Sequence, residues 1–234
     1  MAYLRNTAVI LCIIASLAPT AAFSQKASDR SVRSIFFKRP VEITATAALA
    51  HAGGSISISL PAMSLSDPAT LPPGDLVLAV LPKPPAPGSP IPPGAPSVRI
   101  PAAWSRVLLL FFPDPDNKIF PVRVLPYDGS IPSFKPGEML CLNLSNAAVG
   151  GLLGEAKFRI NPGKSAVLKP SMHEVGDYPV VVDCLLKGET STRPLCRTVW
   201  RHDPETRQIL FIVNADDRRV PRIWSVVESL KASR

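Results

Sequence analysis

Histidine and cysteine side chains are the residues of this chain best suited to bind a metal ion or to act in catalysis. The 234-residue sequence holds three histidines and four cysteines. A blue-copper site needs one cysteine, two histidines and usually a methionine, with most of them close together in a loop. Cys196 is followed by His202 but by no methionine, whereas Met172 and His173 come before it. The order of these residues does not fit blue copper, and the sequence predicts no cofactor.

One polar segment contains three residues that could bind zinc, His173, Glu174 and Asp177. Zinc sites use three or four clustered ligands, but neighbours along a loop need not converge in space. A solvated turn is the simpler interpretation. The sequence also lacks a Gly-x-Ser-x-Gly motif and a glycine-rich phosphate loop. We therefore predict no catalytic residue and no enzyme activity, with a metal-dependent or glycan hydrolase as an alternative.

Residues 1–24 predict a signal helix that is removed on export. Arg5 supplies the positive start, residues 8–18 the apolar centre, and Ala22 and Ser24 small residues near a cleavage point. The apolar centre is too short to span a bilayer comfortably, and no later stretch is longer. We expect a periplasmic or secreted protein without a transmembrane segment, and a flexible mature N-terminus over residues 25–33.

Three cysteines remain after this cleavage, Cys141, Cys184 and Cys196. In an oxidising compartment two of them can pair. Cys184 and Cys196 are the predicted disulfide, because the segment between them can turn the chain back. Closing a loop of that size contributes on the order of 3 kcal/mol in the chain-entropy model. A Cys141–Cys184 bridge stays open as an alternative.

The charge balance is basic. Lysine and arginine number 26 against 18 acids, a formal net charge of +8, and the loss of Arg5 leaves +7. A basic exported protein tends to meet anionic partners such as acidic polysaccharide. The basic residues are scattered, so a polyanion contact is assigned only tentatively, to Arg218, Arg219 and Arg222 near the end. We do not expect nucleic acid as a partner.

Alternating apolar residues predict that the chain is all-β. Residues 107–112 form an unbroken apolar run that ends at Pro-Asp-Pro-Asp-Asn, and residues 120–125 and 139–144 alternate on either side of further turns. Period-two patterning bounded by proline, glycine, asparagine and aspartate is typical of antiparallel strands. A sheet with one apolar face needs a second layer. We predict an antiparallel β-sandwich of the Ig-like or Greek-key type.

The rest of the chain extends this pattern. Further strands are predicted by the segments 34–38, 55–60, 76–81, 98–100, 156–160, 166–168 and 178–186. Segments 195–200 and 208–213 flank the polar residues 201–207, which favours a hairpin. Residues 223–227 fit a helix or a strand, and we favour a strand. We find no convincing internal repeat.

Residues 82–96 are the most biased segment, PKPPAPGSPIPPGAP. Proline removes backbone donors and favours extended polyproline II, so this segment cannot pair within a sheet. It could link a small N-terminal unit to the rest, or form a long surface loop. We favour the loop, and with it a single sandwich domain over residues 34–228 and a frayed tail over residues 229–234.

The order of FKPGEMLCLNLSN, VGGLLGEAKFRINPGKSAVLKP, the TVW strand and QILFIVN resembles that of uncharacterised secreted bacterial β-sandwich proteins. The resemblance covers roughly residues 100–227. It implies a sandwich fold and export, and it brings no catalytic residues. We expect a non-catalytic structural or interaction module of the cell envelope, whose partner is an envelope protein or an anionic polysaccharide. A binding module for an acidic glycan or another polyanion is the alternative.

Overall fold

A computed structural model describes residues 30–86, 88–215 and 220–230. Every regular element in these residues is a strand, and the strands form four sheets of four strands each. These residues include no helix with the length and hydropathy that crossing a membrane requires. The predicted signal helix over residues 1–24 lies outside the described residues.

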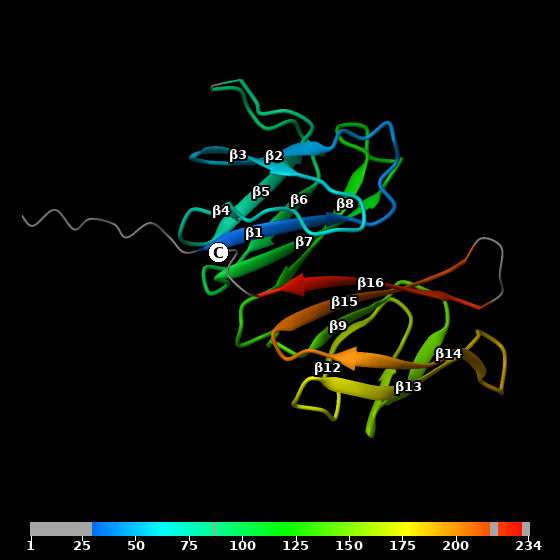
Figure 1. Cartoon of the computed structure of the whole chain (residues 1–234). Helices are drawn as coiled ribbons and strands as arrows, with labels where there is room; N and C mark the ends of the chain where they lie inside the picture. The colour runs from blue at the N-terminus through cyan, green and yellow to red at the C-terminus, as the bar shows by residue number, and fades with distance from the viewer. Residues whose placement is uncertain (1–29, 87, 216–219, 231–234) are drawn as a thin grey trace, which may run out of the picture.

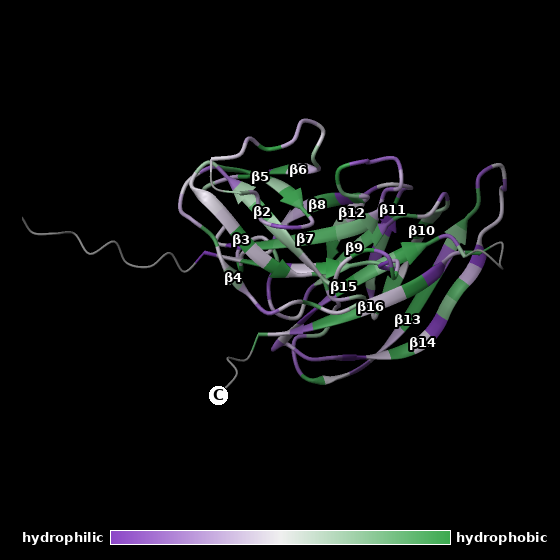
Figure 2. Ribbon diagram, turned by 90° about the horizontal axis from the view of Figure 1, so that it is seen from above, coloured by the Kyte–Doolittle hydropathy of each residue, from purple (hydrophilic) through white to green (hydrophobic). Residues whose placement is uncertain are grey.

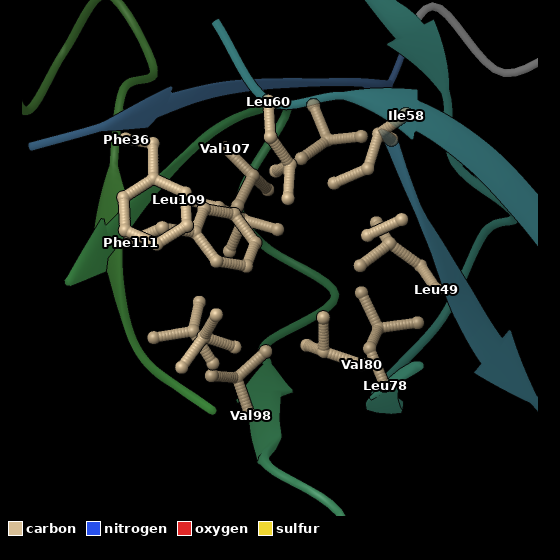
Figure 3. Close-up of a cluster of buried hydrophobic side chains, with 14 of the residues drawn as sticks. Phe36, Leu49, Ile58, Leu60, Leu78, Val80, Val98, Val107, Leu109 and Phe111 are labelled. Carbon is tan, nitrogen blue, oxygen red and sulfur yellow. The ribbon is translucent and has the colours of Figure 1, made fainter. Parts of the chain in front are cut away.

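Sheets A and B are built from the first eight strands. Sheet A has the order β4 (Ala69–Thr70), β1 (Ser31–Phe36), β7 (Arg106–Pro113) and β8 (Val122–Asp128). Sheet B has the order β3 (Gly54–Ser59), β2 (Thr46–His51), β5 (Leu76–Leu81) and β6 (Ser97–Ile100). One buried apolar cluster joins their facing sides, and its members include Phe36, Leu49, Leu78, Leu109 and Phe111 (Figure 3). The two sheets form the N-terminal sandwich.

Sheets C and D are built from the last eight strands. Sheet C has the order β12 (Ser165–Leu168), β9 (Met139–Asn143), β15 (Thr206–Val213) and β16 (Arg222–Ser229). Sheet D has the order β11 (Ala156–Ile160), β10 (Ala148–Leu153), β13 (Gly176–Leu185) and β14 (Arg193–His202). A second cluster lies between them and includes Met139, Val149, Val180, Val182 and Leu210. These sheets form the C-terminal sandwich, which lies below the N-terminal one in Figure 1.

Sheets A and C pack against each other across a third apolar cluster. Leu108, Leu110 and Phe112 of β7 belong to this cluster, whereas Val107, Leu109 and Phe111 point into the N-terminal sandwich. Strand β7 is therefore buried on both faces, which explains its unbroken apolar run. Figure 2 shows β7 and β9 in the hydrophobic colour, while the outer strand β14 carries hydrophilic segments. The layer order is B, A, C, D.

The second eight strands repeat the connectivity of the first eight. In sheet A, β1 is parallel to β7 and antiparallel to β4, and β7 is antiparallel to β8. In sheet C, β9 is parallel to β15 and antiparallel to β12, and β15 is antiparallel to β16. Sheets B and D match each other in the same way. The chain thus contains a structural repeat that its sequence did not reveal.

The prediction of an all-β chain with sheets rich in antiparallel pairs is confirmed. Two layers were expected, and the chain forms four, because β7 and β15 each bury both of their faces. The last segment is a strand, as favoured. Residues 82–96 connect β5 and β6, which pair antiparallel, and Ala95 packs on the outer face of sheet B.

Two local predictions are wrong. The polar segment 201–207 does not close a hairpin, because β14 pairs with β13 in sheet D and β15 pairs with β9 and β16 in sheet C. Residues 31–33, predicted as part of a flexible N-terminus over residues 25–33, belong to β1, whose first residue Ser31 pairs with Arg106 of β7; residues 25–29 lie outside the described residues. Arg30 is buried and donates hydrogen bonds to the carbonyls of Trp104 and Pro72.

Candidate anion-binding site

A buried ion pair lies at one end of the contact between sheets A and C. Arg207 in β15 and Glu228 in β16 stand opposite each other in the strand register. Their side chains are only 1% and 4% exposed, and Arg207 Nε donates to Glu228 Oε2 over 2.9 Å. Arg207 Nη1 donates to the carbonyls of Gly129 and Phe134, each over 2.7 Å. Its guanidinium also lies 4.5 Å from the centre of the Phe134 ring.

A second arginine reaches the same carboxylate from the N-terminal sandwich. Arg33 in β1 donates through Nη1 to Glu228 Oε1 over 3.0 Å and through Nε to the carbonyl of Ser66 over 2.7 Å. Each oxygen of Glu228 is thus bound by a different arginine. Since a carboxylate accepts through both oxygens, one acid links the two sandwiches.

A third arginine, Arg106, lines the cavity beside this pair. The cavity measures about 210 Å³, and its lining includes Ser31, Pro68, Ser229 and Leu230 as well as the three arginines and Glu228. Arg106 is exposed, and among the described residues no hydrogen bond or ion pair involves its guanidinium. Three positive charges therefore face one negative charge. We call this cavity the arginine cavity.

The electrostatics of the arginine cavity favour a further anion. Burial lowers the pKa of Arg207, and the charge and hydrogen bonds of Glu228 act in the opposite direction. The positive charges of Arg106 and Arg33 lower the pKa further. Like charges in a partly dry site repel each other, and an added anion relieves that repulsion.

The zinc candidates do not converge. His173 lines a cavity of about 220 Å³ together with His202, Glu138, Lys135 and Lys169, but Glu174 and Asp177 are not part of its lining. Asp177 instead lies 3.5 Å from Arg201. Among the described residues no group of three or more histidine, cysteine or acidic side chains is placed to hold a metal ion. Sequence proximity in the loop did not produce a common site.

His202 gives this second cavity a pH dependence. Burial lowers the pKa of His202, the charge of Asp203 opposes this, and His173 lowers it again. Around His202 the folded state therefore binds fewer protons than the unfolded state. The contribution of neutral His202 to the stability of the folded state is complete above the ordinary histidine pKa of about 6.5 and is lost as the pH falls below it.

We expect His202→Gln to lose less stability than the wild type between pH 7.5 and pH 5.5, as measured by urea unfolding at each pH. His51→Gln serves as the control, since His51 is the last residue of β2, before the β2–β3 turn, and accepts a hydrogen bond from Gly53 N. Equal losses in the wild type and His202→Gln would show that His202 does not carry the effect.

The predicted Cys184–Cys196 disulfide is not formed in this structure, and Cys141, Cys184 and Cys196 are free thiols. The register places Cys196 opposite Val182 and Cys184 opposite Arg193. Diagonal neighbours across a strand pair lie about 7–8 Å apart, beyond the usual Cα separation of a disulfide. Burial raises the pKa of Cys141 to about 12, which keeps that thiol protonated.

The tentative polyanion residues are only partly described. Arg218 and Arg219 lie outside the described residues. Arg222 is the first residue of β16 and lies opposite Val213, at the other end of the strand from Glu228. The structure therefore does not bring Arg222 to the arginine cavity.

Sequence reasoning missed all four charged residues of the arginine cavity, which lie on β1, β7, β15 and β16. One signal was present: Glu228 continues the alternation of Val226 toward the buried side of β16. A charge at an inward position requires a partner.

No family model and no curated protein sequence matches this chain.

Proposed function

We propose that the protein is an exported, non-catalytic binding module whose arginine cavity holds an anionic group of its partner. The partner is an envelope protein or an anionic polysaccharide. We also propose that the protein is periplasmic or secreted and that it is related to the secreted bacterial sandwich proteins it resembles. Its sandwiches are proposed to be of the Ig-like or Greek-key type, with the proline-rich residues 82–96 as a surface loop.

The observation that carries the proposal is the surplus of guanidinium groups in the arginine cavity. Glu228 is occupied by Arg33 and Arg207, whereas Arg106 lines the same cavity and its guanidinium makes no hydrogen bond within the described residues. Guanidinium groups bind carboxylate and phosphate through paired hydrogen bonds. Arg207 and Glu228 are buried and held by their mutual hydrogen bonds, so this part of the cavity is preorganised before an anion arrives.

The test measures the melting temperature of the mature chain with acetate, citrate, phosphate or sulfate at constant ionic strength. A ligand that binds only the folded state raises its stability, by about 1.4 kcal/mol at ten times Kd. We expect at least one anion to stabilise the wild type and to have less effect on Arg106→Gln.

Arg99→Gln is the matched control, since it removes a strand arginine remote from the cavity lining. The stabilisation should also weaken as sodium chloride is added, because salt screens exposed charges. If no anion distinguishes the wild type from Arg106→Gln, the arginine cavity is not a binding site.

A further inference from the structure

The two sandwiches can be compared residue by residue because their backbone hydrogen bonds match. Phe37 N donates to Phe111 O over 2.9 Å, and Leu144 N donates to Ile212 O over 2.8 Å at the equivalent place. Phe111 of β7 therefore corresponds to Ile212 of β15. Counting back five residues along each strand pairs Arg106 with Arg207. Both side chains point to the contact between sheets A and C, since Leu108 and Ile209 lie two residues further on and belong to the same cluster.

The residues opposite these two arginines differ. Arg207 stands opposite Glu228 in the β15–β16 pair. The β7–β8 register extended by one residue places Gly129 opposite Arg106, and Gly129 N donates to Arg106 O over 2.8 Å. Opposed residues of antiparallel strands share a face. Where the C-terminal sandwich holds a carboxylate against its arginine, the N-terminal sandwich has a glycine without a side chain.

We propose that a carboxylate of the ligand binds Arg106 in the place that Glu228 takes at Arg207. This inference rests on the proposed function and names the chemical class of the anion. A carboxylate accepts charge-assisted hydrogen bonds from a guanidinium, as Glu228 does at Arg207, whose Nε and Nη2 both donate to Glu228 Oε2. Arg33 lines the same cavity and adds a second positive charge.

The size and walls of the arginine cavity select the C-terminus of a peptide as the source of this carboxylate. A cavity of about 210 Å³ has room for one terminal residue. Pro68 and Leu230 add apolar surface next to the arginines, and Ser31 and Ser229 add hydroxyl groups. The apolar part of these walls suits the last side chain of a peptide, and the hydroxyl groups suit its backbone amides. The ligand is therefore a peptide with a free C-terminal carboxylate and an apolar last residue.

The first test supplies the carboxylate from within the chain. Gly129→Glu and Gly129→Gln meet the same neighbours, because a Cβ at this position lies 3.0 Å from Leu108 Cγ and 3.3 Å from Arg106 O. The two variants differ only in charge. We expect Gly129→Glu to melt about 2–4 °C above Gly129→Gln at low ionic strength. The difference should disappear when both carry Arg106→Gln. Equal melting temperatures with Arg106 present would overturn the inference.

The second test titrates the peptide acetyl-Gly-Gly-Leu by calorimetry against its C-terminal amide, inorganic phosphate and galacturonate. We expect the free carboxylate to bind at least about tenfold more tightly than the amide, and Arg106→Gln to abolish the difference. Tighter binding of phosphate that depends on Arg106 would overturn the carboxylate but leave the proposed function in place. Tighter binding of galacturonate would overturn the peptide source. Absence of all binding would overturn both proposals.

Discussion

Replacing Glu228 with glutamine is expected to lower the free energy of unfolding by about 3–5 kcal/mol. The side chain keeps its size, but Arg207 loses its counter-charge at a position that is 1% exposed. Arg33 loses its carboxylate partner at the same time. Breaking one side of a buried ion pair costs far more than the pair contributes, because the remaining charge stays in a dry site. Urea unfolding followed by circular dichroism measures the change.

Asp177→Asn is the matched control for this experiment. It removes a carboxylate from a pair with Arg201 in which the two side chains are 62% and 68% exposed. Exposed pairs contribute about 0–1 kcal/mol, so this change should be small. If Glu228→Gln is no more destabilising than Asp177→Asn, the two sandwiches are not held together by the buried carboxylate.

Arg106→Gln should leave the free energy of unfolding unchanged or raise it slightly, since it removes a positive charge that repels Arg207.

The strands were readable from the sequence because half-buried strands leave a period-two pattern. Ala156–Ile160, in which apolar and charged residues alternate, was located at its observed bounds. Pairing was harder to predict, since alternation records which residues are buried and does not identify the neighbouring strand. The parallel contacts of β1 with β7 and of β9 with β15 join segments far apart in the chain. The apparent hairpin at 201–207 failed for the same reason, as a short polar segment also fits a crossover between sheets.

The structural repeat was hidden because equivalent positions change their chemistry even where both are buried. Phe111 corresponds to Ile212, and Gly129 corresponds to Glu228. Such substitutions preserve the register and erase sequence similarity. The arginine cavity was hidden by distance, since Arg33 and Glu228 are 195 positions apart and meet only after both sandwiches have formed. The only signal in the sequence was Glu228, an acidic residue at a buried position of β16, and this signal does not indicate which residue it pairs with.

The second large effect is expected from Gly151→Ala in β10. A Cβ at this glycine would lie 1.8 Å from Val181 O and 2.8 Å from Val181 C, both in the paired strand β13. Backbone atoms cannot rotate away as a side chain can, so the two strands must separate. Overpacking of well-ordered sites costs about 1–3 kcal/mol, and forced backbone displacement places this variant at or above the upper end. We expect a loss of about 3 kcal/mol or more in urea unfolding.

Gly53→Ala adds the same methyl group where it can be accommodated. Its nearest neighbours are atoms of the His51 imidazole, at 3.3 and 3.4 Å, and this ring can move. The difference between the two variants therefore isolates the close approach of β10 to β13 from the general effect of replacing glycine, which is about 0.4–1 kcal/mol in either direction. Similar unfolding midpoints for both would mean that β10 and β13 are not pressed together at Gly151. A much lower midpoint for Gly151→Ala alone would show that this glycine is required by the packing of sheet D.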